Sequence, residues 1–331
     1  MRSVGIIGGG SWATALVNVV SQTRHHVNWW VRRSETADYI KSHHRNPRYL
    51  PDLSLSRSVE VTHHLSSVVK DSEALIFAVP SAYLARTLEE SLSPKHLQGK
   101  TVVSAIKGME PGSNLTITRY FRDHWKTAPA LTGVISGPCH AEEVAQGKTS
   151  FLTVAFPERR EAEKISHALQ TASLITELSE DVQGIEYAAV MKNIIAVGAG
   201  IFHGLGYGDN LTAVLISRSA MEIKRFLTAA VPAPRDMENT AYLGDLLVTC
   251  YSQFSRNRTF GAMIGKGYSV KNAQLEMNMV AEGYYAARCI HEINRKIKCP
   301  LPVCETVYRI LYENKNSRSA SEELVQKSFS V

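Results

Sequence analysis

Residues 4–20 read VGIIGGGSWATALVNVV and place a glycine-rich turn between two apolar segments. The segment before the glycines predicts a buried strand, and the segment after them predicts a helix. Gly8, Gly10 and Ala13 fit the pattern G-x-G-x-x-G/A, in which the first glycine permits a tight turn and the second lets the backbone approach a pyrophosphate. A small third residue lets the helix pack closely on the strand. We therefore expect a dinucleotide site at this helix N-terminus rather than an ordinary glycine-rich turn.

The end of the second expected strand bears on which dinucleotide would bind. About 20 residues after the glycine pattern, an NAD site usually carries an Asp or Glu that binds the ribose 2′-hydroxyl. Here the strand HVNWWV, residues 26–31, is followed by Arg32 and Arg33 instead. Two guanidinium groups suit a 2′-phosphate better than a hydroxyl, so we expect NADP as the preferred cofactor, with NAD as the alternative. A solvated arginine pair at a strand end is the structural alternative.

The first half of the chain alternates short apolar runs with helical patterns, which is typical of βαβ units and a parallel sheet. We expect strands at residues 4–8, 27–31, 59–61, 74–79, 101–107, 134–136, 151–156 and 173–178, and helices at 11–21 and 82–91. After about Asp181 clear strand signals are absent. Helical patterns follow at residues 182–199, 210–230, 239–253, 281–296 and 303–312. The sequence therefore predicts an α/β fold in two domains: a mostly parallel-sheet domain at 1–181 that binds a dinucleotide, and an all-helical substrate-binding domain at 182–331.

Composition narrows the class of protein. At roughly 150 residues per domain, 331 residues agree with two domains, and 44% hydrophobic with 21% charged residues is ordinary globular usage. A net charge of +6 leaves nucleic acid, an anionic membrane or small anionic ligands as partners. The five cysteines form no CxxC pair and no zinc-spaced cluster, which favours a reduced cytoplasmic location without a metal. Because no apolar stretch approaches the ~18 residues of a membrane span, we expect a soluble protein without membrane insertion.

Lys192 lies on an apolar stripe whose members recur every three or four residues from 182 to 196. An unpaired ammonium is costly to bury, and burial lowers its pKa toward the range where it exchanges a proton near neutral pH. Asp245, in the apolar segment YLGDLLVTC, needs a partner in its turn, and a buried lysine is a candidate. The alternatives for Lys192 are a side chain that snorkels to the edge or a pair with Glu186.

Two further segments predict contacts to an anion. Lys107 ends the expected strand TVVSAIK, at the edge where open α/β sheets bind ligands. Residues 255–258, Ser-Arg-Asn-Arg, concentrate donors without an acid among them, which suits a phosphate. A plain strand-end lysine and a solvated charge run are the respective alternatives.

Taken together, the sequence resembles the bacterial-type NAD(P)-dependent glycerol-3-phosphate dehydrogenases over essentially its whole length. The matching segments, in chain order, are GIIGGGSWATAL, FAVPS, AIKG, ISGP, MKNIIAVGAGIFHGLGYGDN, LISR, LGDLLVTC, SRNRTFG, VAEG and LPVCETVYRILYENKN. The resemblance implies a Rossmann-type N-terminal domain, a helical C-terminal domain and an active site between them. It also implies an oxidoreductase that interconverts dihydroxyacetone phosphate and sn-glycerol 3-phosphate, supplying the backbone of glycerophospholipids.

The resemblance carries roles to individual positions. Lys192 matches the proton-transferring lysine, Lys107 matches a lysine that touches cofactor and substrate, and Asp245 joins them as the third catalytic candidate. The expected substrate contacts are Lys107, Gly137, Cys139, Lys192, Asp245, Ser255, Arg256 and Asn257. The expected cofactor contacts are Gly8, Gly10, Ser11, Trp12, Ala13, Arg32, Arg33, Tyr49, Lys107, Ala141, Arg256, Val280 and Glu282.

Two positions depart from the family pattern. Ala13 stands where the family often has glycine, although the general fingerprint allows alanine. Cys139 stands where a hydroxyl is common, and a thiol is a poorer hydrogen-bond donor, which puts a side-chain contact to substrate there in doubt. A nucleophilic role for Cys139 with His140 is disfavoured, because adjacent residues rarely point at one another and no third orienting group is identifiable.

Two other classes of function compete with this interpretation. A β-hydroxyacid dehydrogenase of the same architecture would act on a carboxylate, whereas residues 255–258 and Lys107 favour a phosphorylated small molecule. A dinucleotide sensor or nucleic-acid-binding protein would use the basic charge, but Lys and Arg are scattered and no helix has a basic recognition face. We therefore expect no nucleic-acid partner, and we count a homodimer among the expected assemblies.

Overall fold

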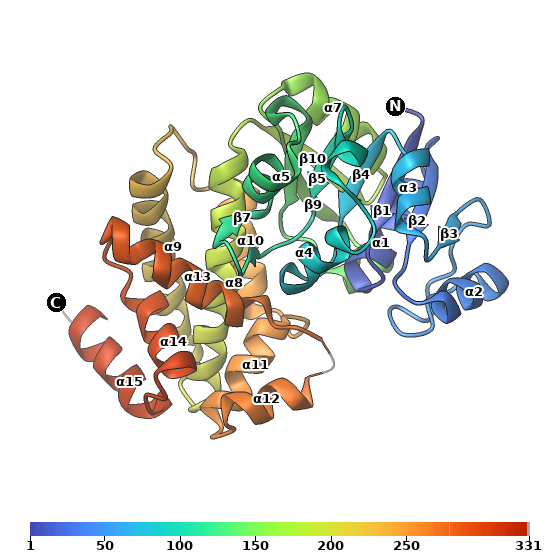
Figure 1. Cartoon of the computed structure of the whole chain (residues 1–331). Helices are drawn as coiled ribbons and strands as arrows, with labels where there is room; N and C mark the ends of the chain where they lie inside the picture. Colours follow the sequence, from blue (N-terminus) through green and yellow to red (C-terminus); the bar gives the residue numbers. More distant parts are fainter. Residues whose placement is uncertain (278, 330–331) are drawn as a thin grey trace. The chain divides into compact units, whose positions relative to one another are not determined.

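The computed structural model describes residues 1–277 and 279–329, and the chain forms two compact units (Figure 1). The first unit comprises Met1–Ile106 and Leu115–Val182, and the second comprises Lys107–Asn114 and Gln183–Val331. The expected division had a single boundary between residues 181 and 182. In the structure, the chain also passes through the second unit at 107–114, so that Lys107 belongs with the helical residues that follow Val182.

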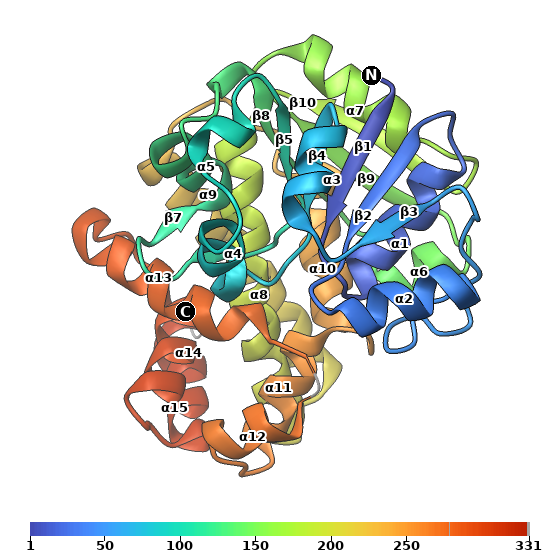
Figure 2. The same cartoon turned by 45° about the vertical axis from the view of Figure 1, so that its right-hand side comes forward.

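One sheet organises the first unit. Its strand order is β10-β9-β8-β5-β4-β1-β2-β3. The strands are β1 (Ser3–Ile7), β2 (His26–Trp30), β3 (Glu60–Thr62), β4 (Ala74–Phe77), β5 (Thr101–Ser104), β8 (Thr132–Ser136), β9 (Ser150–Ala155) and β10 (Leu174–Ser179). All neighbours are parallel except β8 and β9, which confirms the mostly parallel sheet. The order reverses at β1, which has β2 on one side and β4 on the other (Figure 2), and such a reversal is where open α/β sheets bind ligands.

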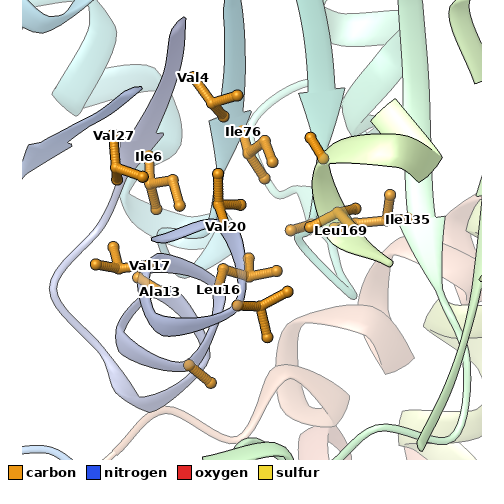
Figure 3. Packing of buried hydrophobic residues seen from close by; sticks show 14 of the residues in the cluster. Val4, Ile6, Ala13, Leu16, Val17, Val20, Val27, Ile76, Ile135 and Leu169 are labelled. Carbon is orange, nitrogen blue, oxygen red and sulfur yellow. The ribbon is translucent and has the colours of Figure 1, made fainter. Parts of the chain in front are cut away.

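Side chains of these strands alternate between two cores, as the period of a β-strand requires. Val4 and Ile6 of β1 belong to one apolar cluster, and Ile7 belongs to the other. Figure 3 shows side chains of α1 facing those of the strands, with Ala13, Leu16, Val17 and Val20 opposite Val4, Ile6, Val27 and Ile76. Burial of both strand faces explains why β1, β2 and β4 read as apolar runs rather than alternating ones.

The first unit completes its layers with helices. They are α1 (Ser11–Ser21), α2 (Ser34–His43), α3 (Leu65–Asp71), α4 (Ser81–Glu89), α5 (Ile117–Trp125), α6 (Ala141–Ala145) and α7 (Arg159–Leu169). Two 3-10 turns, η1 (Pro94–Leu97) and η2 (Pro129–Leu131), and the short strand β7 (Leu115–Thr116) complete it. The expected strand at 101–107 ends at Ser104, so Lys107 lies three residues beyond the strand rather than at its end.

The second unit is built from helices, with the short strand β6 (Met109–Glu110) contributed by the segment 107–114. The helices are α8 (Val182–Gly204), α9 (Asp209–Ala230), α10 (Asp245–Tyr251), α11 (Arg256–Gly265), α12 (Val270–Glu276), α13 (Glu282–Ile297), α14 (Pro302–Tyr312) and α15 (Ser317–Leu324). Two π-helical turns, η3 (Thr240–Gly244) and η4 (Val325–Phe329), adjoin α10 and α15. The single helix expected at 239–253 is therefore the turn η3 followed by α10.

Helix α8 is buried on nearly every face, not only along the predicted stripe. Glycines make this possible, because they let neighbouring helices reach its main chain. A Cβ atom on Gly261 of α11 would lie 2.0 Å from the carbonyl oxygen of Val197, and one on Gly200 would lie 2.1 Å from that of Arg258. Close contact on all sides explains why most residues of α8 are apolar, with Glu186, Lys192 and Asn193 as buried exceptions.

The length and apolar character of α8 require one correction to the sequence-based expectation. Its 23 residues are enough to cross a membrane by length and composition, whereas the sequence predicted no stretch of that kind. The mean hydropathy over 18 residues of α8 stays high although Glu186 and Lys192 are included. A search for uninterrupted apolar residues stops at these two charged residues and therefore does not find the helix. The whole apolar window is buried inside the structure, as in the core helix of a globular protein.

Candidate active site

The glycine turn between β1 and α1 has the backbone geometry that an anion needs. Gly8 has φ +141°, and a Cβ atom there would lie 2.6 Å from the carbonyl oxygen of Ala78. Gly10 caps α1, and a Cβ atom on it would meet nothing within 4 Å. No side chain of the described residues caps α1, and the first turn of α1 contains no acidic residue. The helix N-terminus therefore keeps its positive end and its N–H groups for a ligand.

Two side chains that the sequence analysis missed hold this turn in place. The indole N–H of Trp29 donates to the carbonyl oxygen of Gly8 at 2.7 Å. The buried amide of Asn46 donates to the carbonyl oxygen of Gly9 at 3.1 Å and to the hydroxyl of Thr14 at 2.8 Å. Neither residue belongs to the glycine pattern, and each reaches the turn from a distant part of the sequence. Only their spatial neighbours reveal this role.

The residues around the turn fit a dinucleotide. Trp12 has a buried indole N–H without a hydrogen-bond partner among residues 1–277 and 279–329, and a buried donor of this kind calls for a ligand atom. Ser11 begins α1, and Ala13 packs in the core under β1. Beyond β2, Arg32 and Arg33 are exposed and make no ion pair with the described residues. Tyr49 is half-buried, and its backbone N–H donates to Asn46 at 3.3 Å.

Three expected contacts follow β8 in the first unit. Gly137 has φ +151°, and a Cβ atom there would lie 2.7 Å from the carbonyl oxygen of Phe151. The thiol of Cys139 donates to the carbonyl oxygen of Gly137 at 3.1 Å. The thiol hydrogen therefore stays within the turn that these two residues form. Cys139 and Ala141, the first residue of α6, pack in the same apolar core as α1.

A carboxylate and two lysines meet inside the second unit. Asp245, the first residue of α10, is 1% exposed. Lys107 donates to its Oδ2 atom at 3.0 Å, and Lys192 of α8 donates to its Oδ1 atom. Lys192 also donates to the hydroxyl of Thr249, one turn along α10, at 3.0 Å. We call Lys107, Lys192, Asp245 and Thr249 the lysine–carboxylate cluster. Lys192 is buried and held by Asp245, which excludes the snorkelling alternative.

The electrostatics of the cluster favour an anionic ligand. Burial alone would raise the pKa of the Asp245 carboxyl, but the ammonium groups of Lys107 and Lys192 hold that pKa below its ordinary value. Two ammonium groups on one carboxylate leave one positive charge in excess. In a buried setting this excess attracts negative charge more strongly than it would in water. Lys107 retains about a fifth of its side-chain exposure, so the cluster reaches the surface of its unit through that lysine.

The donors at 255–258 take different positions from one another. The hydroxyl of Ser255 caps α11 by accepting from the N–H of Arg258 at 3.3 Å. Asn257 is buried, and its amide donates to Asn193 at 2.9 Å. Arg256 is exposed in the first turn of α11, within 3.7 Å of the Met279 sulfur. The segment is therefore a helix N-terminus with one solvent-facing arginine, rather than four parallel donors.

The two remaining expected contacts lie at the start of α13. Glu282 is its first residue, and Val280 precedes the helix; both are half-buried. The structure thus brings some of the expected residues together. Gly8, Gly10, Ser11, Trp12 and Ala13 lie together at the glycine turn. The three catalytic candidates meet in the lysine–carboxylate cluster.

Comparison with known proteins shows the family and the fold of the chain. Residues 3–162 match the family described as NAD-dependent glycerol-3-phosphate dehydrogenase N-terminus, and residues 181–322 match its C-terminus. A glycerol-3-phosphate dehydrogenase (NAD(P)+) from Salinibacter ruber is 38% identical over 327 residues, covering 98% of this chain and 95% of that protein. A relative of the same name from Pelodictyon phaeoclathratiforme is 33% identical over 98% of each chain. The structure of glycerol-3-phosphate dehydrogenase from Coxiella burnetii is similar with a TM-score of 0.91 at 27% identity, covering 98% of this chain and 99% of that one.

Proposed function

Since this chain belongs to the NAD-dependent glycerol-3-phosphate dehydrogenase family, we propose that its lysine–carboxylate cluster carries out the family reaction. That reaction interconverts dihydroxyacetone phosphate and sn-glycerol 3-phosphate with NAD(P)H. The observation that supports this assignment is that Lys107 and Lys192 both donate to one buried carboxylate, that of Asp245. Such a cluster offers both a proton and a stabilising charge to an oxygen that becomes negative during reduction.

Each member of the cluster has a separate task in the reduction. The bound dinucleotide supplies the hydride. As the C2 carbonyl oxygen of dihydroxyacetone phosphate gains negative charge, Lys192 donates its proton to that oxygen and Lys107 stabilises the charge. Asp245 orients both ammonium groups, and the hydroxyl of Thr249 holds Lys192 from the other side. In the oxidation of sn-glycerol 3-phosphate, neutral Lys192 accepts the hydroxyl proton.

The substrate phosphate meets the remaining donors in this proposal. Arg256 at the N-terminus of α11 is the charged contact, and Ser255 and Asn257 support it. Gly137 and Cys139 contribute through their main chain, because the Cys139 thiol already donates to Gly137. These roles rest on the match of each position to the family pattern and on the exposed or buried state of each side chain.

The cofactor is held by the glycine turn and its neighbours. Gly8, Gly10 and Ser11 present the helix N-terminus to the pyrophosphate, Trp12 offers its indole N–H, and Ala13 keeps α1 close to β1. Arg32 and Arg33 favour the 2′-phosphate of NADP, while NAD also binds. Further proposed contacts, carried over from the family, are Tyr49, Lys107, Ala141, Arg256, Val280 and Glu282.

The reaction assigns the chain to glycerophospholipid synthesis, with a phosphorylated small molecule as its partner. A cytoplasmic location and a homodimer belong to the same proposal. The cysteines support the first, since the chain has five free thiols and no disulfide among the described residues.

Loss of absorbance of NADPH and of NADH, each mixed with dihydroxyacetone phosphate, tests the function. We expect a rate with both cofactors and a faster one with NADPH. No rate with either cofactor would contradict the assigned reaction. A faster rate with NADH would contradict the role given to Arg32 and Arg33 while leaving the reaction intact.

A further inference from the structure

A continuous chain of hydrogen bonds inside the second unit ends on the main chain of Lys107. The N–H of Gly283, in the first turn of α13, donates to the amide oxygen of Asn257 at 2.9 Å. The amide nitrogen of Asn257 donates to the amide oxygen of Asn193 at 2.9 Å. The amide nitrogen of Asn193 then donates to the carbonyl oxygen of Lys107 at 2.6 Å. Three helices and the segment 107–114 are therefore joined through two side chains.

The direction of this chain is fixed by its two ends. A backbone N–H can only donate, so the oxygen of Asn257 must face Gly283, and its nitrogen must face Asn193. A backbone carbonyl can only accept, so the nitrogen of Asn193 must face Lys107. Both ends demand the same orientation, and neither amide can rotate by half a turn without placing two donors or two acceptors together. A fully satisfied buried network of this kind holds a single arrangement.

Packing holds the chain against the same turn of α8 that carries Lys192. Asn193 is 4% exposed and Asn257 is 8% exposed. A Cβ atom on Gly283 would lie 2.5 Å from the carbonyl oxygen of Asn193, so α13 reaches the main chain of α8 there. Asn193 consequently has little freedom to move, and its hydrogen bond fixes the carbonyl oxygen of Lys107 to α8.

We propose that Asn193 is a positioning residue for Lys107. It anchors the main chain of Lys107 to α8, next to Lys192, and so sets where the Lys107 ammonium lies relative to Asp245. The lysine has a flexible four-carbon stem, and β6, which follows it, spans only Met109–Glu110. A fixed main chain at residue 107 therefore limits the volume the ammonium can sample. The inference rests on the proposed function, in which Lys107 stabilises the developing oxyanion.

Replacement of Asn193 by leucine tests this inference, because leucine preserves the size of the side chain and removes its donor and acceptor. We expect Asn193→Leu to lower kcat for dihydroxyacetone phosphate about 10- to 100-fold, since misplacement of a catalytic group by about 1 Å can cost about 100-fold in rate, with KM for NADPH within about 2-fold. In a chain that already carries Lys107→Ala, the same substitution should lower kcat less than about 3-fold, because the ammonium that Asn193 positions has been removed. Asn272→Leu, on the exposed face of α12, is the matched control and should change neither value.

Hydrogen exchange of the segment 107–112 gives a readout that does not depend on activity. Asn193→Leu should accelerate exchange there, and the control should not. Asn193→Ser, which leaves room for a water molecule, replaces the leucine variant if that variant does not fold. Equal losses of kcat with and without Lys107 would overturn the inference, as would unchanged exchange at 107–112. Absence of activity in the unsubstituted chain would instead overturn the proposed function, and the exchange data would still decide the role of Asn193.

Discussion

The glycine turn and the lysine–carboxylate cluster present two opposite ways of holding a charged ligand. The turn uses main-chain groups of the neighbouring residues 8 to 11, and its defining property is the absence of side chains at residues 8 to 10. The cluster uses three charged side chains that are 53 to 138 residues apart in sequence. Added bulk is therefore the change that damages the turn, whereas a lost charge is the change that damages the cluster.

The largest expected effect comes from removing the proton donor of the cluster. Lys192→Ala should lower kcat by about 100- to 10,000-fold, the usual contribution of a general acid. NADPH affinity should stay nearly intact, because Lys107 still neutralises Asp245 and the glycine turn is untouched. Steady-state kinetics with fluorescence titration of NADPH measures both quantities. Lys271→Ala, an exposed lysine of α12, is the control, and normal turnover of the Lys192 variant would remove Lys192 from the mechanism.

A second buried carboxylate shows how burial would shift the pKa of Asp245 if its two lysines were absent. Glu222 of α9 is 0% exposed and accepts the N–H groups of Val303 and Cys304 in α14, at 2.7 and 3.2 Å. Burial raises the pKa of this carboxyl to about 7, against the pull of those two N–H groups. The pKa of Asp245 moves the other way, because ammonium groups compensate its burial.

The raised pKa of Glu222 predicts a pH dependence of stability. The folded state binds the proton more tightly than the unfolded state, so the stabilisation is complete below the ordinary pKa of Glu and is lost as pH rises through about 7. We expect the unsubstituted chain to lose about 3 kcal/mol of unfolding free energy, relative to Glu222→Gln, between pH 4 and pH 8. Urea unfolding across this range measures the difference, with Glu276→Gln on the surface of α12 as control. Parallel pH curves for the Glu222 variant and the unsubstituted chain would contradict the assignment.

Bulk added to the glycine turn should act on the cofactor alone. Gly10 adopts φ −84° and ψ −179°, and a Cβ atom there meets nothing within 4 Å. Gly10→Ala should therefore leave the melting temperature unchanged while it lowers NADPH affinity about 10- to 100-fold, through the lost approach of the pyrophosphate. Gly208 has nearly the same backbone, φ −82° and ψ 177°, also caps a helix and also faces open space. Gly208→Ala is thus a matched control, and equal affinity losses in both variants would argue against a pyrophosphate at Gly10.

The smallest expected effect concerns the choice of cofactor. Replacing Arg32 and Arg33 together by alanine should raise KM for NADPH about 10-fold, the value of one charge-assisted hydrogen bond, and leave KM for NADH unchanged. Arg57→Ala, at an exposed position of the same unit, controls for the loss of surface charge. A parallel rise of KM for both cofactors would show that the arginines bind a part that NADH and NADPH share.

The difference between the two regions also explains which features the sequence could predict. Gly8, Gly10 and Ala13 lie within six residues, so their pattern predicts the turn that the structure confirms between β1 and α1. The pairing of Lys107 with Lys192 through Asp245 depends on how helices pack, which local patterns do not encode. The sequence predicted that Asp245 needs a partner and that a buried lysine is a candidate, but it did not predict that Lys107 and Lys192 meet on the same carboxylate.

The residues that hold the glycine turn and the main chain of Lys107 could not be predicted from the sequence, for the same physical reason. Asn46, Trp29 and Asn193 act through contacts with residues at least 21 positions away. No local pattern predicts the role of any of them, although Asn193 lies in the family segment that also carries Lys192. The end of β5 was also misplaced, because the apolar run continues to Ile106 while the ladder with β4 and β8 stops at Ser104. Ala105 and Ile106 are buried beyond the end of the strand, and a hydrophobic pattern does not distinguish a buried residue in a strand from one that follows it.

The passage of the chain through the second unit at Lys107–Asn114 limits how the genes of two related enzymes can recombine and still encode an active protein. A single crossover near residue 182 in the gene would exchange α8 and everything after it but leave this passage with the other parent. Lys107 would then arrive from one ancestor and its partners Asp245 and Asn193 from another. Recombinants made at that point should keep their activity only when both parents agree over these eight residues, so the two units are expected to be inherited together.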